Sequence, residues 1–77
     1  MANRPDIKLV SHWDIVYQSD LVTVEMGDVP FDGFRAEIWR VKPAKETGVR
    51  AKTFYGETAW MDARRLAADI DFGAWSL

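Results

Sequence analysis

The fold is decided by residues 59–70, whose sequence is Ala59-Trp60-Met61-Asp62-Ala63-Arg64-Arg65-Leu66-Ala67-Ala68-Asp69-Ile70. Its apolar residues recur with the period of one helix face, which comprises Ala59, Ala63, Leu66, Ala67 and Ile70. Thr58 is the expected N-cap, because its hydroxyl can accept a hydrogen bond from a free backbone N–H. Gly73 can end the helix in a left-handed conformation, with Phe72 or Trp75 folding back onto it. We therefore expect one amphipathic helix with a buried face.

Upstream of this helix, four segments alternate between apolar and polar residues, as β-strands with one buried face do. They comprise residues 8–17, 21–26, 34–41 and 49–55. Short turns at 18–20 and 42–48 would join them as two hairpins, separated by a loop at 27–33. The sequence thus predicts an α+β fold: a four-stranded antiparallel sheet covered on one face by a single C-terminal helix. The other face is expected to meet water.

The length of 77 residues leaves room for a single small domain, residues 1–77. Cysteine is absent, which excludes disulfides and thiolate zinc sites, and His12 is the only histidine. We therefore expect neither a metal site nor a cofactor. The core is therefore expected to come from aromatic and aliphatic packing, and the four Trp, four Phe and two Tyr residues are many large apolar groups for so short a chain.

Charge and hydropathy restrict the class of partner. Ten basic and twelve acidic residues give a net charge of −2, which is too balanced for a non-specific nucleic-acid binder. Residues 1–6 lack the apolar stretch of a signal peptide, and no apolar run is long enough to span a membrane. The sequence therefore predicts a cytoplasmic protein without a membrane partner.

Catalytic residues are not expected. His12 and Asp14 lie two positions apart on a predicted strand, so both side chains can point to the same side. An acid–base site also needs a nucleophile or metal and a cleft that excludes water, and no neighbouring residue supplies them. We interpret the pair as part of a polar strand face and predict that the chain is not an enzyme.

The candidate contact surface is the predicted outward side of the second hairpin. It combines aromatic and charged residues, namely Arg35, Glu37, Trp39, Arg50, Lys52 and Phe54. Three interpretations compete: a solvated face stabilised by cation–π contacts, a protein-binding patch, and a platform on which single-stranded nucleic-acid bases stack on Trp39 and Phe54.

Two large residues of the predicted helix, Trp60 and Met61, lie at the edges of its apolar stripe. They either close over the edge of the sheet or, together with Trp75, form a dimer or partner surface. Homodimerisation therefore stays open.

A family resemblance concerns residues 52–69, Lys52-Thr53-Phe54-Tyr55-Gly56-Glu57-Thr58-Ala59-Trp60-Met61-Asp62-Ala63-Arg64-Arg65-Leu66-Ala67-Ala68-Asp69. This segment resembles the end of many small phage and prophage proteins, in which a last strand runs through Gly-Glu into an Ala-rich helix. Some anti-CRISPR proteins have this size and layout. The resemblance implies a stoichiometric inhibitor of a host protein or nucleoprotein complex, such as a CRISPR effector, and assigns no role to any individual residue.

The predicted function is accordingly that of a small non-catalytic interaction protein, anti-CRISPR-like in its implied role. A single-stranded nucleic-acid-binding module is the alternative. Direct contact with nucleic acid is disfavoured by the slightly acidic chain.

Overall fold

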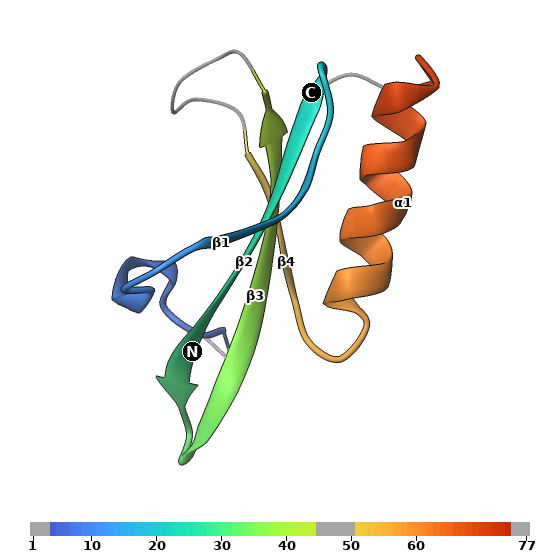
Figure 1. Ribbon diagram of the computed structural model, residues 1–77. Coiled ribbons are helices and arrows are strands. Elements are labelled where there is room, and N and C mark those ends of the chain that lie inside the picture. The colour runs from blue at the N-terminus through green and yellow to red at the C-terminus, as the bar shows by residue number, and fades with distance from the viewer. Residues whose placement is uncertain (1–3, 45–50, 75–77) are drawn as a thin grey trace.

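The computed structural model describes residues 4–44 and 51–74. It contains one antiparallel sheet in the order β1-β2-β3-β4 and a C-terminal helix, α1. The elements are η1 (Ile7–Leu9), β1 (Asp14–Gln18), β2 (Val22–Phe31), β3 (Phe34–Pro43), β4 (Lys52–Tyr55) and α1 (Ala59–Asp71). Figure 1 shows α1 on one face of the sheet and the N-terminal segment with η1 on the other. The predicted α+β fold is confirmed.

The longest pairing is the hairpin of β2 and β3, which was not predicted. Its two turn residues, Asp32 and Gly33, have φ angles of 51° and 80°. Left-handed residues at both positions match the twist of a two-residue hairpin turn. The expected loop at 27–33 is therefore wrong. Pro30 is tolerated within β2 because β1 pairs with this strand only as far as Met26, so no third strand needs its missing N–H.

The core beneath the helix is built from small and β-branched residues. The buried residues of α1 are Ala59, Ala63, Ala67 and Ile70, on the predicted stripe. The last three pack against Val22, Val24 and Val41 of the sheet, and half-buried Trp39, Phe54 and Leu66 surround this cluster. The largest fully buried side chains are Ile38 and four valines. The aliphatic part of the expected core is therefore confirmed, whereas Trp39 and Phe54 lie at its margin and are only half-buried.

The C-terminal end of α1 has the expected left-handed glycine, whereas the N-terminal end lacks the expected side-chain cap. At the C-terminal end, the N–H of Gly73 donates to Ile70 O at 3.0 Å and that of Ala74 to Asp69 O at 2.8 Å, with Gly73 at φ 78°. This is a Schellman motif. Phe72 does not fold back, since it is 87% exposed, and Trp75 lies outside the described residues. At the N-terminal end, Thr58 precedes the helix but its hydroxyl makes no capping hydrogen bond.

The face opposite α1 is partly covered, contrary to the expectation that it meets water. Val29 and Ile38 are fully buried there, and Pro5 of the N-terminal segment is also buried. The predicted strand at 8–17 begins only at Asp14. Of the preceding residues, Ile7–Leu9 form η1, where the Asp6 carboxylate accepts a hydrogen bond from the N–H of Lys8 at 2.9 Å.

A paired charge lies on this second face. Glu25 is only 7% exposed, and its Oε1 accepts hydrogen bonds from Nε and Nη2 of Arg40 at 3.0 and 2.8 Å. Lys42 Nζ lies 3.4 Å from the same oxygen, and the Arg40 guanidinium stacks 3.9 Å from the centroid of the Trp13 ring. Because an unpaired buried carboxylate is costly, these cations make the burial of Glu25 tolerable.

Gly27 is a point where the N-terminal segment closely approaches the sheet. A Cβ atom at this position would lie 2.4 Å from Cγ1 of Val10 and 3.2 Å from the carbonyl oxygen of His12. The absence of a side chain therefore lets residues 10–12 lie directly on β2.

We expect Gly27→Ala to destabilise the protein by about 1–3 kcal/mol, because the added methyl group overpacks this contact. Urea unfolding monitored by Trp fluorescence measures the change. The double variant Val10→Ala, Gly27→Ala should lose less than the sum of the two single changes, because it removes the clashing methyl group. Wild-type stability of Gly27→Ala would contradict the described packing of the N-terminal segment.

Candidate functional site

The predicted contact surface does not lie on an open sheet face. Trp39 and Phe54 are cross-strand neighbours on the face that α1 covers, and both pack against the core. Lys52 is exposed and lies opposite Val41. Arg50 lies outside the described residues. The predicted position of these two half-buried aromatic residues, on the face that points away from the helix, is thus wrong.

The remaining two members, Arg35 and Glu37, are exposed on the same face of β3. Arg35 Nη2 lies 2.5 Å from Oδ1 of Asp28, and Glu37 Oε1 accepts a hydrogen bond from Trp39 Nε1 at 3.1 Å. The structure therefore brings Arg35, Glu37 and Trp39 together as predicted, but beside the helix.

The His12–Asp14 pair forms as its spacing predicts, with Nε2 of the histidine 2.8 Å from Oδ1 of Asp14. Both side chains are largely exposed, at 76% and 60%. In residues 4–44 and 51–74, no group of three or more His, Cys, Asp or Glu side chains could hold a metal ion. The same residues contain no helix long and apolar enough to cross a membrane.

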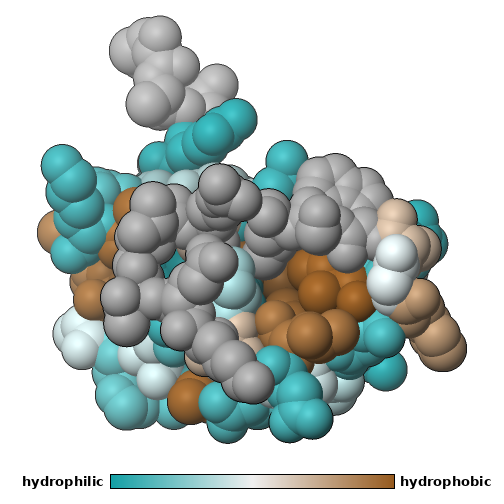
Figure 2. Space-filling view, turned by 90° about the horizontal axis from the view of Figure 1, so that it is seen from above, coloured by the Kyte–Doolittle hydropathy of each residue, from teal (hydrophilic) through white to brown (hydrophobic). Residues whose placement is uncertain are grey.

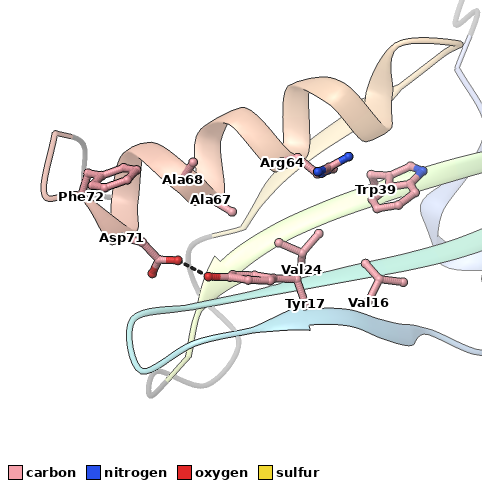
Figure 3. Close-up of a pocket in the computed structure, with 9 residues that line it drawn as sticks. All are labelled: Val16, Tyr17, Val24, Trp39, Arg64, Ala67, Ala68, Asp71 and Phe72. Carbon is pink, nitrogen blue, oxygen red and sulfur yellow. Dashed lines mark hydrogen bonds between the residues drawn. The ribbon is translucent and has the colours of Figure 1, made fainter.

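A groove with a volume of about 600 Å³ lies between α1 and the β1 side of the sheet. The helix packs on β2, β3 and β4 and so leaves this side open. Figure 3 shows the strand residues facing α1 across the groove. The lining consists of Val16, Tyr17, Val24, Trp39, Arg64, Ala67, Ala68, Asp71 and Phe72. Most of these groups are apolar, and the two charges belong to α1.

A bulge in β1 shapes one wall of the groove. The register with β2 shifts between Ile15 and Tyr17, so that Val16 and Tyr17 both line the groove. Ile15 pairs with Glu25 on the opposite face. Strict alternation along residues 8–17 places Ile15 and Tyr17 on the same side of the strand, and this is wrong because the bulge inserts one extra residue.

A hydrogen-bonded clasp joins β1 to the last turn of α1 at the end of the groove. The Tyr17 hydroxyl donates to Oδ2 of Asp71, and the Ser19 hydroxyl donates to Oδ1 at 2.6 Å. The hydrogen bonds from Ser19 and then Tyr17 lower the pKa of Asp71 below its usual value. The hydrogen bond to Asp71 in turn raises the pKa of Tyr17. The clasp therefore favours an ionised carboxylate and a neutral phenol.

A second concavity, of about 500 Å³, lies near the N-terminal end of α1. It is lined by Arg35, Ala36, Glu37, Trp39, Gly56, Glu57 and Trp60, so Trp39 borders both hollows. Trp60 and Met61 are 43% and 46% exposed, so neither is sequestered over the edge of the sheet.

Several large apolar side chains near the groove reach the surface. Val16, Tyr17 and Phe72 of its lining are 45%, 44% and 87% exposed, and Leu21 is 55% exposed. Figure 2, which looks onto the end of the molecule where α1 terminates, shows hydrophobic residues gathered among hydrophilic ones. The groove thus opens onto a surface that is partly apolar.

No family model matches the chain, and searches of curated proteins and of solved structures find no match either.

The clasp predicts how the pKa of Asp71 responds to substitution. Ser19→Ala should raise this pKa towards its ordinary value of 3.8 more than Tyr17→Phe does, because the Ser19 hydrogen bond is the larger cause of the shift. Titration of the Asp71 carboxyl carbon by NMR measures both changes. An unchanged pKa in both variants would show that the clasp does not form in solution.

The sign of the accompanying stability change follows from the lowered pKa. An ionised Asp71 stabilises the fold above the unfolded-state pKa, and this contribution is lost as the pH falls below about 4 through the folded-state value. At high pH the group concerned is Tyr17, whose raised pKa means that its neutral phenol stabilises the fold. This stabilisation is lost as the pH rises above about 10, through the folded-state pKa of Tyr17.

Proposed function

We propose that this chain is a non-catalytic protein-binding module whose groove between α1 and β1 holds apolar side chains of a partner protein. The observation that carries the proposal is the groove itself, an open, largely apolar hollow bordered by aromatic residues. Its volume of about 600 Å³ falls within the range of established binding pockets, which is roughly 300–1,000 Å³.

The chemistry of the lining supports an apolar occupant. The floor is formed by Val24 and Trp39, and Ala67 and Ala68 on the helix side leave space that larger residues would fill. Tyr17 contributes a ring beside a polar hydroxyl that is already satisfied by Asp71. Aromatic residues of this kind are enriched where protein interfaces form, and burying exposed apolar surface would supply the driving force.

The alternative of a nucleic-acid platform has less support. It depended on Trp39 and Phe54 standing free on an open sheet, whereas both pack against the core under α1. The groove lining contains one cation, Arg64, and one anion, Asp71. A surface that binds phosphates needs several positive charges, so the groove suits a protein segment better.

The inhibitory role implied by the resemblance to anti-CRISPR proteins stays a prediction. A stoichiometric inhibitor of a host protein or nucleoprotein complex would need a binding surface, and the groove is the part of the described chain that fits this requirement best.

The proposal can be tested with peptides selected for binding to this protein from a random display library. Ala68 is exposed and lines the groove, so Ala68→Arg fills the hollow with a charged side chain without disturbing the core. We expect it to weaken binding of the selected peptides by about tenfold or more, measured by fluorescence anisotropy.

The matched control is Leu9→Arg, which places the same side chain at a 58% exposed apolar residue on the opposite side of the sheet. Binding should persist in this control. Selected peptides that bind Ala68→Arg as tightly as the unmodified protein would rule out the groove as the binding site.

A further inference from the structure

The concavity near the N-terminal end of α1 combines two indole rings with two carboxylates. Trp39 and Glu37 come from β3, Trp60 comes from the first turn of α1, and Glu57 precedes the helix. The meander thus brings together residues that are about twenty positions apart in the sequence. Side chains of these two kinds in one hollow suit a ligand that is both flat and positively charged.

The negative charges of Glu37 and Glu57 are not neutralised by the other residues that line this pocket. Arg35 also lines it, but the guanidinium of Arg35 is paired with Asp28 at 2.5 Å. Of the salt bridges formed between described residues, none involves Glu37 or Glu57. Glu37 accepts a hydrogen bond from Trp39 Nε1, which orients the indole but leaves the negative charge in place. The pocket therefore carries an excess of negative charge.

The indole of Trp60 already attracts a guanidinium within the protein itself. The Cζ atom of Arg64 lies 5.7 Å from the centroid of this ring, within the range of a cation–π contact. Arg64 lines the neighbouring groove and does not line the pocket. The Trp60 ring thus remains part of the pocket wall while its surroundings favour cations.

We propose that this pocket binds the guanidinium group of an arginine side chain of the partner protein. A guanidinium can stack on an indole and donate hydrogen bonds to carboxylates at the same time. In this pocket the acceptors of those hydrogen bonds would be Glu37 and Glu57. Because Trp39 lines both hollows, the arginine lies next to the apolar residues that occupy the groove. The identity of the ligand as part of a protein rests on the proposed function, whereas the chemistry of the pocket does not.

The pocket can be tested without the partner, using N-acetyl-arginine N-methylamide as the probe. Titration into ¹⁵N-labelled protein should shift the indole N–H signals of Trp39 and Trp60 in a saturable manner. The citrulline analogue has nearly the same shape but no charge and should cause no saturable shift. Equal binding of the two probes, or saturable shifts confined to residues outside the pocket, would overturn the assignment.

Charge-neutralising variants identify the groups that bind the probe. Glu37→Gln and Glu57→Gln should each weaken binding about two- to fivefold, because each removes one exposed charge next to the guanidinium. Asp20→Asn removes an exposed charge that does not line the pocket and should leave the affinity unchanged. Equal weakening in all three variants would indicate a general effect of net charge and would contradict a defined site.

This experiment separates failure of the pocket from failure of the groove. If the probe does not bind but Ala68→Arg abolishes peptide binding, the proposed function stands and the arginine site is wrong. If the probe binds as expected but Ala68→Arg leaves peptide binding intact, the pocket is correct and the groove is not the docking site.

Discussion

The architecture depends on the close packing of the alanine face of α1 against the valines of β2 and β3. Ala63 and Ala67 carry only a methyl group, so the helix can lie directly on Val24 and Val41. A single helix of this diameter covers three strands and leaves β1 without a cover on this face. The groove is therefore the consequence of one helix packing on a four-stranded sheet. Larger residues on the helix would have moved it outward and changed the depth of the hollow.

This mode of packing also determines where the aromatic residues lie. The largest fully buried side chains are those of Ile38 and four valines. Trp39 and Phe54 consequently lie at the margin of the core, and Trp60 and Phe72 lie further out. A composition rich in aromatic residues thus predicted the amount of apolar surface in this chain but not its location. The aromatic groups border the hollows in which we place binding.

The helix and the existence of four antiparallel strands could be predicted because each depends on a local period. The spacing of alanines at 59, 63 and 67 reports one buried helix face regardless of what covers it. The orientation of the strands could not be predicted in the same way. Ile38 and Trp39 are adjacent, and each packs on a different face, because the N-terminal segment covers the second face of the sheet. Alternation of apolar and polar residues shows which face of a sheet is buried only where the other face meets water.

The candidate sites were only partly visible in the sequence. The spacing of Arg35, Glu37 and Trp39 correctly placed them together. The position of Trp60 at the edge of the apolar stripe left open whether this residue packs over the sheet or is exposed, and the structure shows it 43% exposed. The groove depends instead on the bulge at Val16 and on contacts between residues more than fifty positions apart, such as Tyr17 and Asp71. No local pattern reports either feature, because a bulge looks like ordinary strand sequence until its partner strand is known.

The order of the strands in the sheet has a consequence for how quickly the chain folds. Each strand pairs with its immediate neighbour in the sequence, and β2 and β3 are joined by only two residues, Asp32 and Gly33. Loops this short lose little entropy when they close, and low contact order is associated with rapid folding. The clasp joins the β1 end of the sheet to the end of α1, residues more than fifty positions apart in the sequence, so we expect it to form late, after the hairpins have assembled.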